Sequence, residues 1–336
     1  MNALFRTKLK NATGDSPLLL RAIKKAQGLR FALRYGKYYS NLGIERASTK
    51  EVNLEFSSAC NLRCSFCALD HQAPKSYMSL EVLDRIIHDI TTDKRFEGVE
   101  RIQLHHGGET LMHPKRHELF ERIAEAKWSH HAKGKSFPEV HLLTNGMLLR
   151  ENTARQLLEL EVMDSVVFSF DGGSPEAFES LRVNAKWDKF YDNTRVFDKV
   201  RKEMDSTIKM TGITIVHQPH PLNSSWMHPD FVEVISLMDS VEFRRLHDWG
   251  GKVETGESPS PPNKLGCDLL MDQLVVFPGG NVTVCCNDLN GEGVVGNVLE
   301  NDLYSIYSSL QRLEQLHQMM WGRKDQINLC KDCHSY

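Results

Sequence analysis

The feature that most constrains the fold is a sixfold alternation of apolar runs and helical patterns between residues 50 and 250. Six runs rich in Val, Ile, Leu and Phe have the length of strands: Val52–Phe56, Val99–Leu104, Val140–Leu143, Val166–Phe170, Ile213–Val216 and Phe243–Leu246. Helical patterns separate or follow them: Leu80–Ile90, His117–Ala126, Thr153–Leu160, Pro175–Leu181, Phe190–Met204 and Phe231–Met238. Strands that alternate with helices favour a parallel sheet. We therefore expect an α/β fold, a partial (β/α)6 barrel with its active site at the carboxyl ends of the strands.

The eight cysteines fall into groups and leave residues 68–266 without any. No secretory signal opens the chain, which indicates a reducing compartment in which clustered thiols bind metal more often than they form disulfides. The first group is Cys60-Asn-Leu-Arg-Cys64-Ser-Phe-Cys67. A structural zinc site needs four ligands, whereas three thiolates on a 4Fe-4S cluster leave one iron open for chemistry. A zinc site completed by His71 is the alternative.

This C-x3-C-x2-C spacing, with Phe66 just before the last cysteine, resembles the radical S-adenosylmethionine (SAM) superfamily. The resemblance implies a 4Fe-4S cluster on Cys60, Cys64 and Cys67 whose open iron binds the amino and carboxylate groups of SAM. It also implies reductive cleavage of SAM to a 5′-deoxyadenosyl radical that abstracts hydrogen, and an electron donor such as flavodoxin or ferredoxin. In such chemistry the protein supplies position and shielding.

The residues at the expected strand ends agree with this family. His106-Gly107-Gly108-Glu109-Thr110 resembles the family's GGE motif, with Thr110 in place of the usual proline. The third strand ends in Thr144-Asn145-Gly146, and the fourth in Ser169-Phe170-Asp171-Gly172. Singly, glycine pairs and Asn-Gly are most often turns. The resemblance implies that the cofactor is bound by Gly107, Gly108, Glu109, Asn145, Ser169, Asp171 and Arg182.

A second, smaller domain is expected after a linker at residues 254–266. Two β-like runs, Leu274–Phe277 and Val282–Val284, flank Pro278-Gly279-Gly280 as in a hairpin, and a helical stretch follows at Leu303–Met320. The spacing Cys267-x12-Gly280-x4-Cys285 resembles the opening of the SPASM domain, and one further pair, Cys330-x2-Cys333, matches its single-cluster form, the twitch domain. This implies an auxiliary 4Fe-4S cluster on Cys267, Cys285, Cys330 and Cys333, which shuttles electrons because no iron is left open. A four-cysteine zinc site is the alternative.

Cys286 is left over from these two ligand sets. The Gly-x4-Cys spacing favours Cys285 as the ligand, although the sequence does not decide between the two neighbours. A spare thiol is most often a small buried hydrophobe. The alternative is a catalytic role in which Cys286 donates hydrogen to a substrate radical, as a cysteine does in radical SAM epimerases.

Two reactions are compatible with one auxiliary cluster, namely dehydrogenation of an alcohol and epimerisation. The first 50 residues are too short for the leader-recognition domain common in peptide-modifying relatives, which favours a small hydroxylated substrate such as a sugar or aminocyclitol. A polar pocket is expected from residues at or near strand ends: His105, His106, His217, Gln218, His247, Asp248 and Trp249. A peptide maturase and a non-catalytic iron–sulfur electron carrier are the other candidates, and a carrier does not need a barrel with an open three-thiolate site.

The basic N-terminal segment contrasts with the rest of the chain. Residues 1–50 hold 11 Lys and Arg against 2 Asp and Glu, a net charge of +9, whereas the whole chain carries -3. Apolar residues at helical spacing predict an amphipathic helix packed on the main domain; they are Leu18, Leu19, Leu20, Ile23, Ala26, Leu29 and Leu33. Contact with a membrane surface or an anionic substrate is the alternative. The overall charge argues against a general nucleic-acid binder, and no apolar run is long enough to span a bilayer. We expect a cytoplasmic enzyme with a basic helical extension at 1–49, a barrel at 50–253 and a cluster domain at 267–336.

Overall fold

The computed structural model describes residues 17–40, 46–215, 226–244, 246, 248–254 and 266–333. Its main feature is a nine-stranded sheet with the order β11-β10-β9-β1-β3-β4-β5-β7-β8. The six expected strands are present and run parallel to their neighbours: β1 (Glu51–Leu54), β3 (Arg101–Leu104), β4 (Glu139–Thr144), β5 (Ser165–Ser169), β7 (Lys209–Ile215) and β8 (Ser240–Arg244). The α/β fold with a partial parallel barrel is therefore confirmed.

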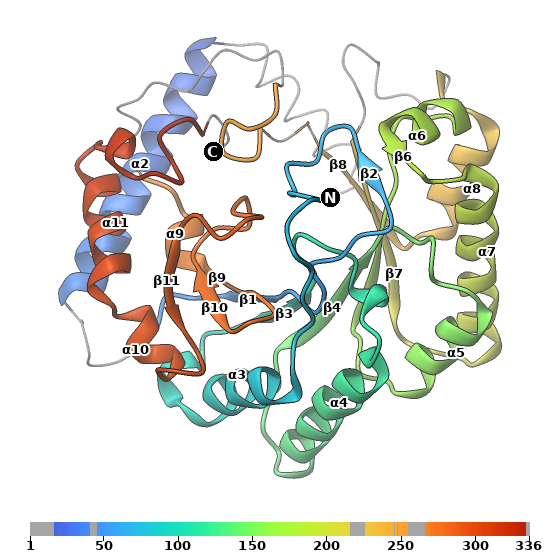
Figure 1. The fold of residues 1–336 in the computed structure, drawn as a ribbon, viewed down its shortest axis with the longest axis horizontal. Coiled ribbons are helices and arrows are strands. Elements are labelled where there is room, and N and C mark those ends of the chain that lie inside the picture. Colours follow the sequence, from blue (N-terminus) through green and yellow to red (C-terminus); the bar gives the residue numbers. More distant parts are fainter. Residues whose placement is uncertain are drawn as a thin grey trace.

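Helices cover the outside of this sheet, as Figure 1 shows. They are α3 (Leu80–Thr92), α4 (Arg116–Ala132), α5 (Glu151–Glu159), α6 (Pro175–Leu181), α7 (Trp187–Glu203) and α8 (Pro229–Leu237), with 3-10 turns η1 (Lys94–Phe96) and η2 (Thr110–Met112). Side-chain caps define two of the starts: Ser79 accepts a hydrogen bond from the backbone N–H of Val82, and Ser174 accepts one from that of Ala177, just before Pro175 at the first position of α6.

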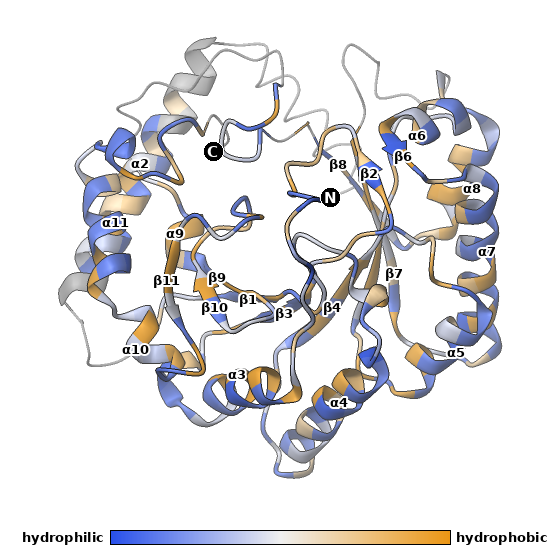
Figure 2. Cartoon of the chain, in the orientation of Figure 1, coloured by the Kyte–Doolittle hydropathy of each residue, from blue (hydrophilic) through white to orange (hydrophobic). Residues whose placement is uncertain are grey.

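The strands bury alternate side chains against the helices. Val52, Leu54, Ile102 and Leu104 are fully buried on β1 and β3, and their neighbours point to the other face. Figure 2 shows the hydrophobic colour gathered on the strands, with hydrophilic residues on the outer sides of α4 and α7. The core therefore lies between sheet and helices, and the opposite face of each strand is left for the barrel interior.

The C-terminal segment extends this same sheet. The expected hairpin is formed by β9 (Gln273–Val276) and β10 (Asn281–Thr283), and a further strand that the sequence did not predict, β11 (Val294–Asn297), lies beside β10. β9 pairs in parallel with β1, with Leu274 opposite Val52. The cluster domain is thus joined to the barrel through backbone hydrogen bonds.

The helical stretch expected at Leu303–Met320 is divided in two, which corrects the prediction of one helix. α10 (Leu303–Tyr307) ends at Ser308, and α11 (Leu310–Met320) begins after Ser309, whose side chain accepts a hydrogen bond from the backbone N–H of Arg312. Two short elements, α9 (Leu269–Asp272) and the 3-10 turn η4 (Lys324–Gln326), complete the domain.

The basic N-terminal helix α2 (Pro17–Ser40) packs against α11, and the two lie side by side in Figure 1. Phe31 is buried, and Arg34 forms ion pairs with Asp268 and Asp272. The expectation that Leu29 and Leu33 belong to the packed face is wrong, because these side chains are 64% and 69% exposed. None of the helices in the described part of the chain is long and apolar enough to cross a membrane.

Candidate functional site

The first cysteine group lies in the loop between β1 and α3, above the carboxyl end of β1. Within it, β2 (Arg63–Cys64) pairs antiparallel with β6 (Arg182–Val183), so that Cys64 stands opposite Arg182. The backbone N–H of Ser65 also donates to the carbonyl of Leu181 at 2.9 Å. These bonds hold the cysteine loop against the end of α6, a contact that no sequence pattern predicts.

The three thiols of this loop are half-buried and interact with one another. Burial raises the pKa of Cys60 and of Cys64 to about 11, and it also raises that of Cys67, while the positive charge of Arg182 acts in the opposite direction. The backbone N–H of Leu62 and the side-chain amide of Asn145 donate to Sγ of Cys60, at 3.5 and 4.0 Å. Such N–H···S bonds suit thiolates that hold an iron–sulfur cluster.

The GGE segment brings the ends of β3 and β4 together. Both carboxylate oxygens of Glu109 accept hydrogen bonds: Oε1 from the hydroxyl of Thr144 at 2.9 Å and Oε2 from the backbone N–H of Asn145 at 2.8 Å. A Cβ on Gly108 would lie 1.9 Å from the carbonyl oxygen of Ser57, so only glycine fits there. Glu109 therefore joins elements of the barrel, and SAM contacts by Gly107 and Gly108 stay a prediction.

Ser169, Asp171 and Arg182 are brought together as a group. Arg182 donates from Nε to Oδ2 of Asp171 at 2.7 Å and from Nη2 to Oγ of Ser169 at 2.6 Å. The other oxygen of Asp171 accepts the backbone N–H of Ile215 at 2.5 Å. Because the Arg182 side chain is only 6% exposed and its charge acts on Cys60 and Cys64, this guanidinium stands beside the cysteine loop. That is a suitable place for a ligand carboxylate.

Cys267, Cys285, Cys330 and Cys333 come from three separate segments and interact electrostatically. Burial raises the pKa of Cys330, and neighbouring Cys267 and Cys333 raise it further. The pKa of Cys285 is raised by its hydrogen bond with Cys286, by burial and by neighbouring Cys267. Its Sγ accepts the backbone N–H of Asn287 at 3.4 Å. The four thiols have the number and the donor type that a 4Fe-4S cluster requires.

Cys286 lies apart from this group. A hydrogen bond with Cys285 lowers the pKa of Cys286, and the positive charges of His106 and Arg244 lower it further. His106 follows β3 and Arg244 ends β8, so these two positive charges come from the barrel, whereas Cys267 acts on Cys285. Cys285 as the cluster ligand, the choice that the Gly-x4-Cys spacing favours, stays a prediction.

Across residues 17–40, 46–215, 226–244, 246, 248–254 and 266–333, no three His, Cys, Asp or Glu side chains converge as they would around one ion. The eight cysteines, all of them in these ranges, form no disulfide.

The barrel interior carries a polar layer that sequence reasoning found only in part. His105 and His106 lie at the end of β3 as expected. Glu55, just after β1, lies beside His106, and Asn53 of β1 lies opposite Gln103 of β3. Asn53 and Glu55 were missed, although polar residues alternate with Val52, Leu54 and Phe56 along this run. His217, Gln218 and His247 lie outside the described residues.

The segment after β8 and the C-terminal domain both contact the first cysteine loop. Trp249 has a positive φ of 49°, rare for a bulky residue, and its Nε1 donates to the carbonyl of Phe66 at 2.8 Å. The side chain of Asn290 accepts the backbone N–H of Asp70 at 3.0 Å and donates to the carbonyl of Ala68 at 3.1 Å. The two cysteine groups are thus tied to each other by short links.

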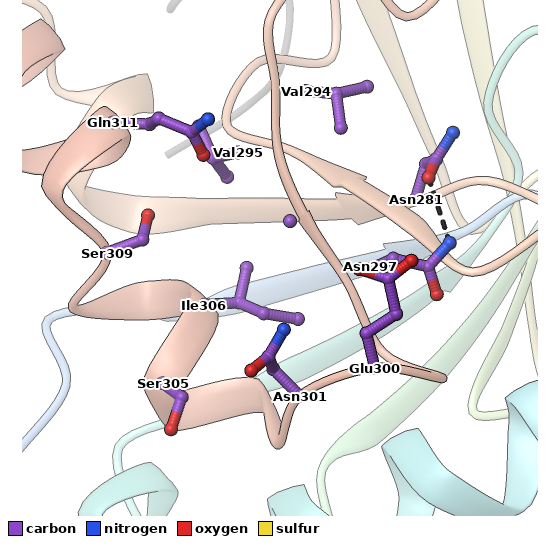
Figure 3. Close-up of a pocket in the computed structure, with 11 residues that line it drawn as sticks. Asn281, Val294, Val295, Asn297, Glu300, Asn301, Ser305, Ile306, Ser309 and Gln311 are labelled. Atoms are coloured by element: carbon purple, nitrogen blue, oxygen red, sulfur yellow. Dashed lines mark hydrogen bonds between the residues drawn. The ribbon is translucent and has the colours of Figure 1, made fainter.

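A surface hollow of about 420 Å³ lies elsewhere, beside the edge strand β11 and the helices α10 and α11 (Figure 3). Its lining includes Asn281 and Asn297, joined by a hydrogen bond of 2.9 Å, and contains neither a cysteine nor an interior barrel residue. We therefore place the candidate site at the cysteine loops and the barrel interior.

Comparisons with known proteins agree with this placement. Residues 54–219 match the radical SAM superfamily, and residues 267–334 match an iron–sulfur cluster-binding domain, SPASM. A GTP 3′,8-cyclase from Chlorobaculum tepidum is 30% identical over 201 residues, which cover 58% of this chain and 53% of that protein. The subtilosin biosynthesis protein AlbA from Bacillus subtilis is 28% identical over 134 residues, 39% of this chain and 26% of that protein. The chain thus spans about half or less of these two relatives.

Two solved structures share the fold. The structure of BtrN in complex with AdoMet and 2-DOIA has a TM-score of 0.56 at 19% identity, covering 87% of this chain and 95% of that one. The Streptococcus suis protein SuiB, bound to the precursor peptide SuiA, has a TM-score of 0.64 at 14% identity, covering 91% and 75%. With the cysteine loop, the barrel and the C-terminal cysteines in place, the chain belongs to the radical SAM superfamily and carries a C-terminal SPASM-type iron–sulfur domain.

Proposed function

We propose that this radical SAM enzyme abstracts a hydrogen atom from a small, polyhydroxylated substrate such as a sugar or an aminocyclitol, and that the reaction ends in oxidation or epimerisation. Cys60, Cys64 and Cys67 would hold the SAM-binding cluster, and Cys267, Cys285, Cys330 and Cys333 the auxiliary one. When bound, the first cluster and SAM supply a 5′-deoxyadenosyl radical. The chain's own residues bind the substrate and exclude water.

The observation that carries the substrate class is a set of unsatisfied polar atoms inside the barrel. Within the described residues, three buried atoms toward the carboxyl ends of β1 and β3 have no hydrogen-bond partner: Oδ1 of Asn53, Nδ1 of His105 and Nε2 of His106. β1 and β3 are neighbours in the sheet. Leaving such a group buried and unpaired costs about 1–3 kcal/mol. A ligand with several hydroxyl groups can serve both the donors and the acceptors.

The test is hydrogen transfer from a labelled substrate. The reconstituted enzyme is incubated anaerobically with SAM, a reductant and C-deuterated polyols, among them myo-inositol and glucosamine, and deuterium in 5′-deoxyadenosine is measured by mass spectrometry. We expect deuterium transfer from at least one polyol. The matched control is the Cys60/Cys64/Cys67→Ala triple variant, which should keep about four of about eight irons and cleave no SAM.

Three other results would contradict the proposal. Transfer from a labelled peptide and from no polyol would indicate a peptide-modifying enzyme. No 5′-deoxyadenosine above the level of the triple variant would indicate an electron carrier. About four irons with one bound zinc in the wild type would remove the auxiliary cluster from the reaction.

Epimerisation is a second candidate, favoured by Cys286, a thiol outside the two ligand sets whose pKa is lowered by its hydrogen bond with Cys285 and by the positive charge of His106. Such a thiol could return a hydrogen atom to a substrate radical. In D2O, the wild type should then place solvent-derived deuterium in an epimerised product. Cys286→Ala should lose that product and still form 5′-deoxyadenosine, and an epimer made by the variant would exclude this role.

A further inference from the structure

His106 is held in one orientation by a buried carboxylate. Its Nδ1 lies 2.7 Å from Oε2 of Glu55, and both side chains are only 2% exposed. Glu55 also accepts the backbone N–H of Gly107 at 3.3 Å, and its own N–H donates to the carbonyl of Val276 at 2.9 Å. The edge-to-face ring of Phe277, 5.2 Å away between centroids, limits rotation of the imidazole. With Nδ1 bound to Glu55, Nε2 is the nitrogen left for another partner.

The surroundings of His106 and of the neighbouring His105 shift their pKa values in opposite directions. Burial lowers the pKa of His105 to about 3, so this ring stays neutral and is a poor base. Burial also disfavours the charged form of His106, but the hydrogen bond and charge of Glu55 outweigh it and raise the pKa of His106 above 6.5. The other groups that act on His106 are Cys286 and Asp288, both of which favour its charged form. Two neighbouring groups whose pKa values are pushed apart are typical of an acid–base assignment.

We propose that His106, oriented by Glu55, accepts the hydroxyl proton of the substrate at Nε2 and so commits the reaction to oxidation. The inference rests on the proposed function, since it needs a hydroxylated carbon whose C–H bond has been broken. That hydrogen atom leaves to the 5′-deoxyadenosyl radical. The O–H bond then breaks, its proton forms an N–H bond on His106, the C–O bond becomes C=O, and one electron leaves to an acceptor of the iron–sulfur class.

Nε2 of His106 satisfies the requirements for this step. It is buried, lacks a hydrogen-bond partner among the described residues, and belongs to the same strand end as the orphaned Nδ1 of His105. A carboxylate that binds one imidazole nitrogen fixes the tautomer and strengthens the other nitrogen as a base. Neither Asp171 nor Glu109 is as well placed to accept this proton, because both oxygens of each carboxylate already accept hydrogen bonds from the chain.

The test separates hydrogen abstraction from proton removal. His106→Gln is compared with the wild type on the C-deuterated polyol that gives the strongest transfer in the screen above. Deuterium in 5′-deoxyadenosine should stay within about threefold, whereas the carbonyl product, trapped with hydroxylamine, should fall by about 100-fold or more. His130→Gln is the matched control, because His130 lies on α4 outside the barrel, bonded to the carbonyl of Ala126 at 2.9 Å. It should behave as wild type.

Glu55→Gln tests the proposal if His106→Gln fails to fold. Binding of the polyol gives a further readout, one that does not depend on turnover. The rate of carbonyl formation should rise with pH as His106 loses its proton. In Glu55→Gln this rise should occur at lower pH, because Glu55 raises the pKa of His106. Calorimetric binding of the same polyol to the SAM-loaded enzyme, without reductant, should weaken about tenfold in His106→Gln. No deuterium transfer by the wild type would overturn the proposed function itself. Normal transfer with undiminished carbonyl formation in His106→Gln, or an unchanged pH dependence in Glu55→Gln, would overturn only the role of His106.

Discussion

At the scale of single residues, the two glycines of the GGE segment differ in what surrounds them. A Cβ on Gly108 would lie 1.9 Å from the carbonyl oxygen of Ser57 and 2.7 Å from that of Ala59, both backbone atoms. At Gly107 the nearest atom is Cδ1 of Leu69, at 3.0 Å, the movable end of a side chain. Gly108→Ala should therefore lower the free energy of unfolding by about 3 kcal/mol, and Gly107→Ala by less than about 1 kcal/mol. Thermal unfolding of the two variants checks this, and equal losses would contradict it.

A second residue-scale prediction concerns acid sensitivity. The pKa of His105 falls from 6.5 in the unfolded chain to about 3 in the folded one, because burial disfavours its charged form. Protons then bind the unfolded chain more readily, and stability is lost as the pH falls below 6.5, by about 1.4 kcal/mol per unit until the folded pKa is reached. Between pH 7 and pH 5, His105→Gln should lose roughly 2 kcal/mol less than the wild type.

Anaerobic urea unfolding at the two pH values measures this difference. His117→Gln, on the exposed surface of α4, serves as the control and should follow the wild type. If His105→Gln shows the same loss as the wild type, His105 is already charged or exposed in the folded protein.

The site residues differ in whether the sequence around each of them is enough to predict its place in the site. The three cysteines of the first loop, and the group of Ser169, Asp171 and Arg182, could be found because spacing and strand-end position are properties of the sequence. The choice of Cys285 over Cys286 rests on the Gly-x4-Cys spacing alone, since adjacent residues share most local patterns, and it stays a prediction. The role of Glu55 is not predicted for a related reason. It lies within the apolar run Val52–Phe56, and its partner His106 is 51 positions away in the sequence.

At the scale of elements, the helix α2 braces the segment that leads to the first auxiliary cysteine. Nη1 of Arg34 lies 2.9 Å from Oδ1 of Asp268, the residue after Cys267, and Phe31 packs so closely that a Cβ on Gly266 would lie 2.5 Å from it. We expect Phe31→Ala/Arg34→Ala to lose the auxiliary cluster, lowering bound iron from about eight to about four per chain, because a Phe→Ala change in a core costs about 3–5 kcal/mol.

Iron and acid-labile sulfide after desalting measure this loss. Leu29→Ala/Leu33→Ala removes apolar side chains of the same helix that are 64% and 69% exposed, and it should keep all the iron. A basic helix that only touched a membrane or an anionic substrate would give the same iron content in both variants.

The helices and strands were predicted best where the spacing of the apolar residues and the length of the apolar segment indicate the same element. The six parallel strands and the helices between them were readable because each βα unit carries its own apolar pattern. The break at Ser308-Ser309 was not, since the apolar positions of α10 and α11 continue across it and only the cap at Ser309 starts the second helix. The pairing of β9 with β1 joins residues 222 positions apart, and no local pattern reports such a contact.

At the scale of the whole molecule, the continuous sheet makes one folding unit of the barrel and the auxiliary domain. Val276, fully buried on β9, stands opposite Leu54 of β1, and both contribute to the hydrophobic core. Val276→Ala should therefore weaken the protection of backbone amides in β3 and β4 as much as in β10, by about 2 kcal/mol, because opening either half breaks the β9–β1 ladder. Hydrogen exchange followed by mass spectrometry resolves these strands. Val183→Ala, on the small β2–β6 sheet and 45% exposed, is the control and should leave both halves unchanged. A loss confined to β9, β10 and β11 would show that the auxiliary domain opens independently, and the spacing between the two cysteine groups would then depend only on the links made by Trp249 and Asn290.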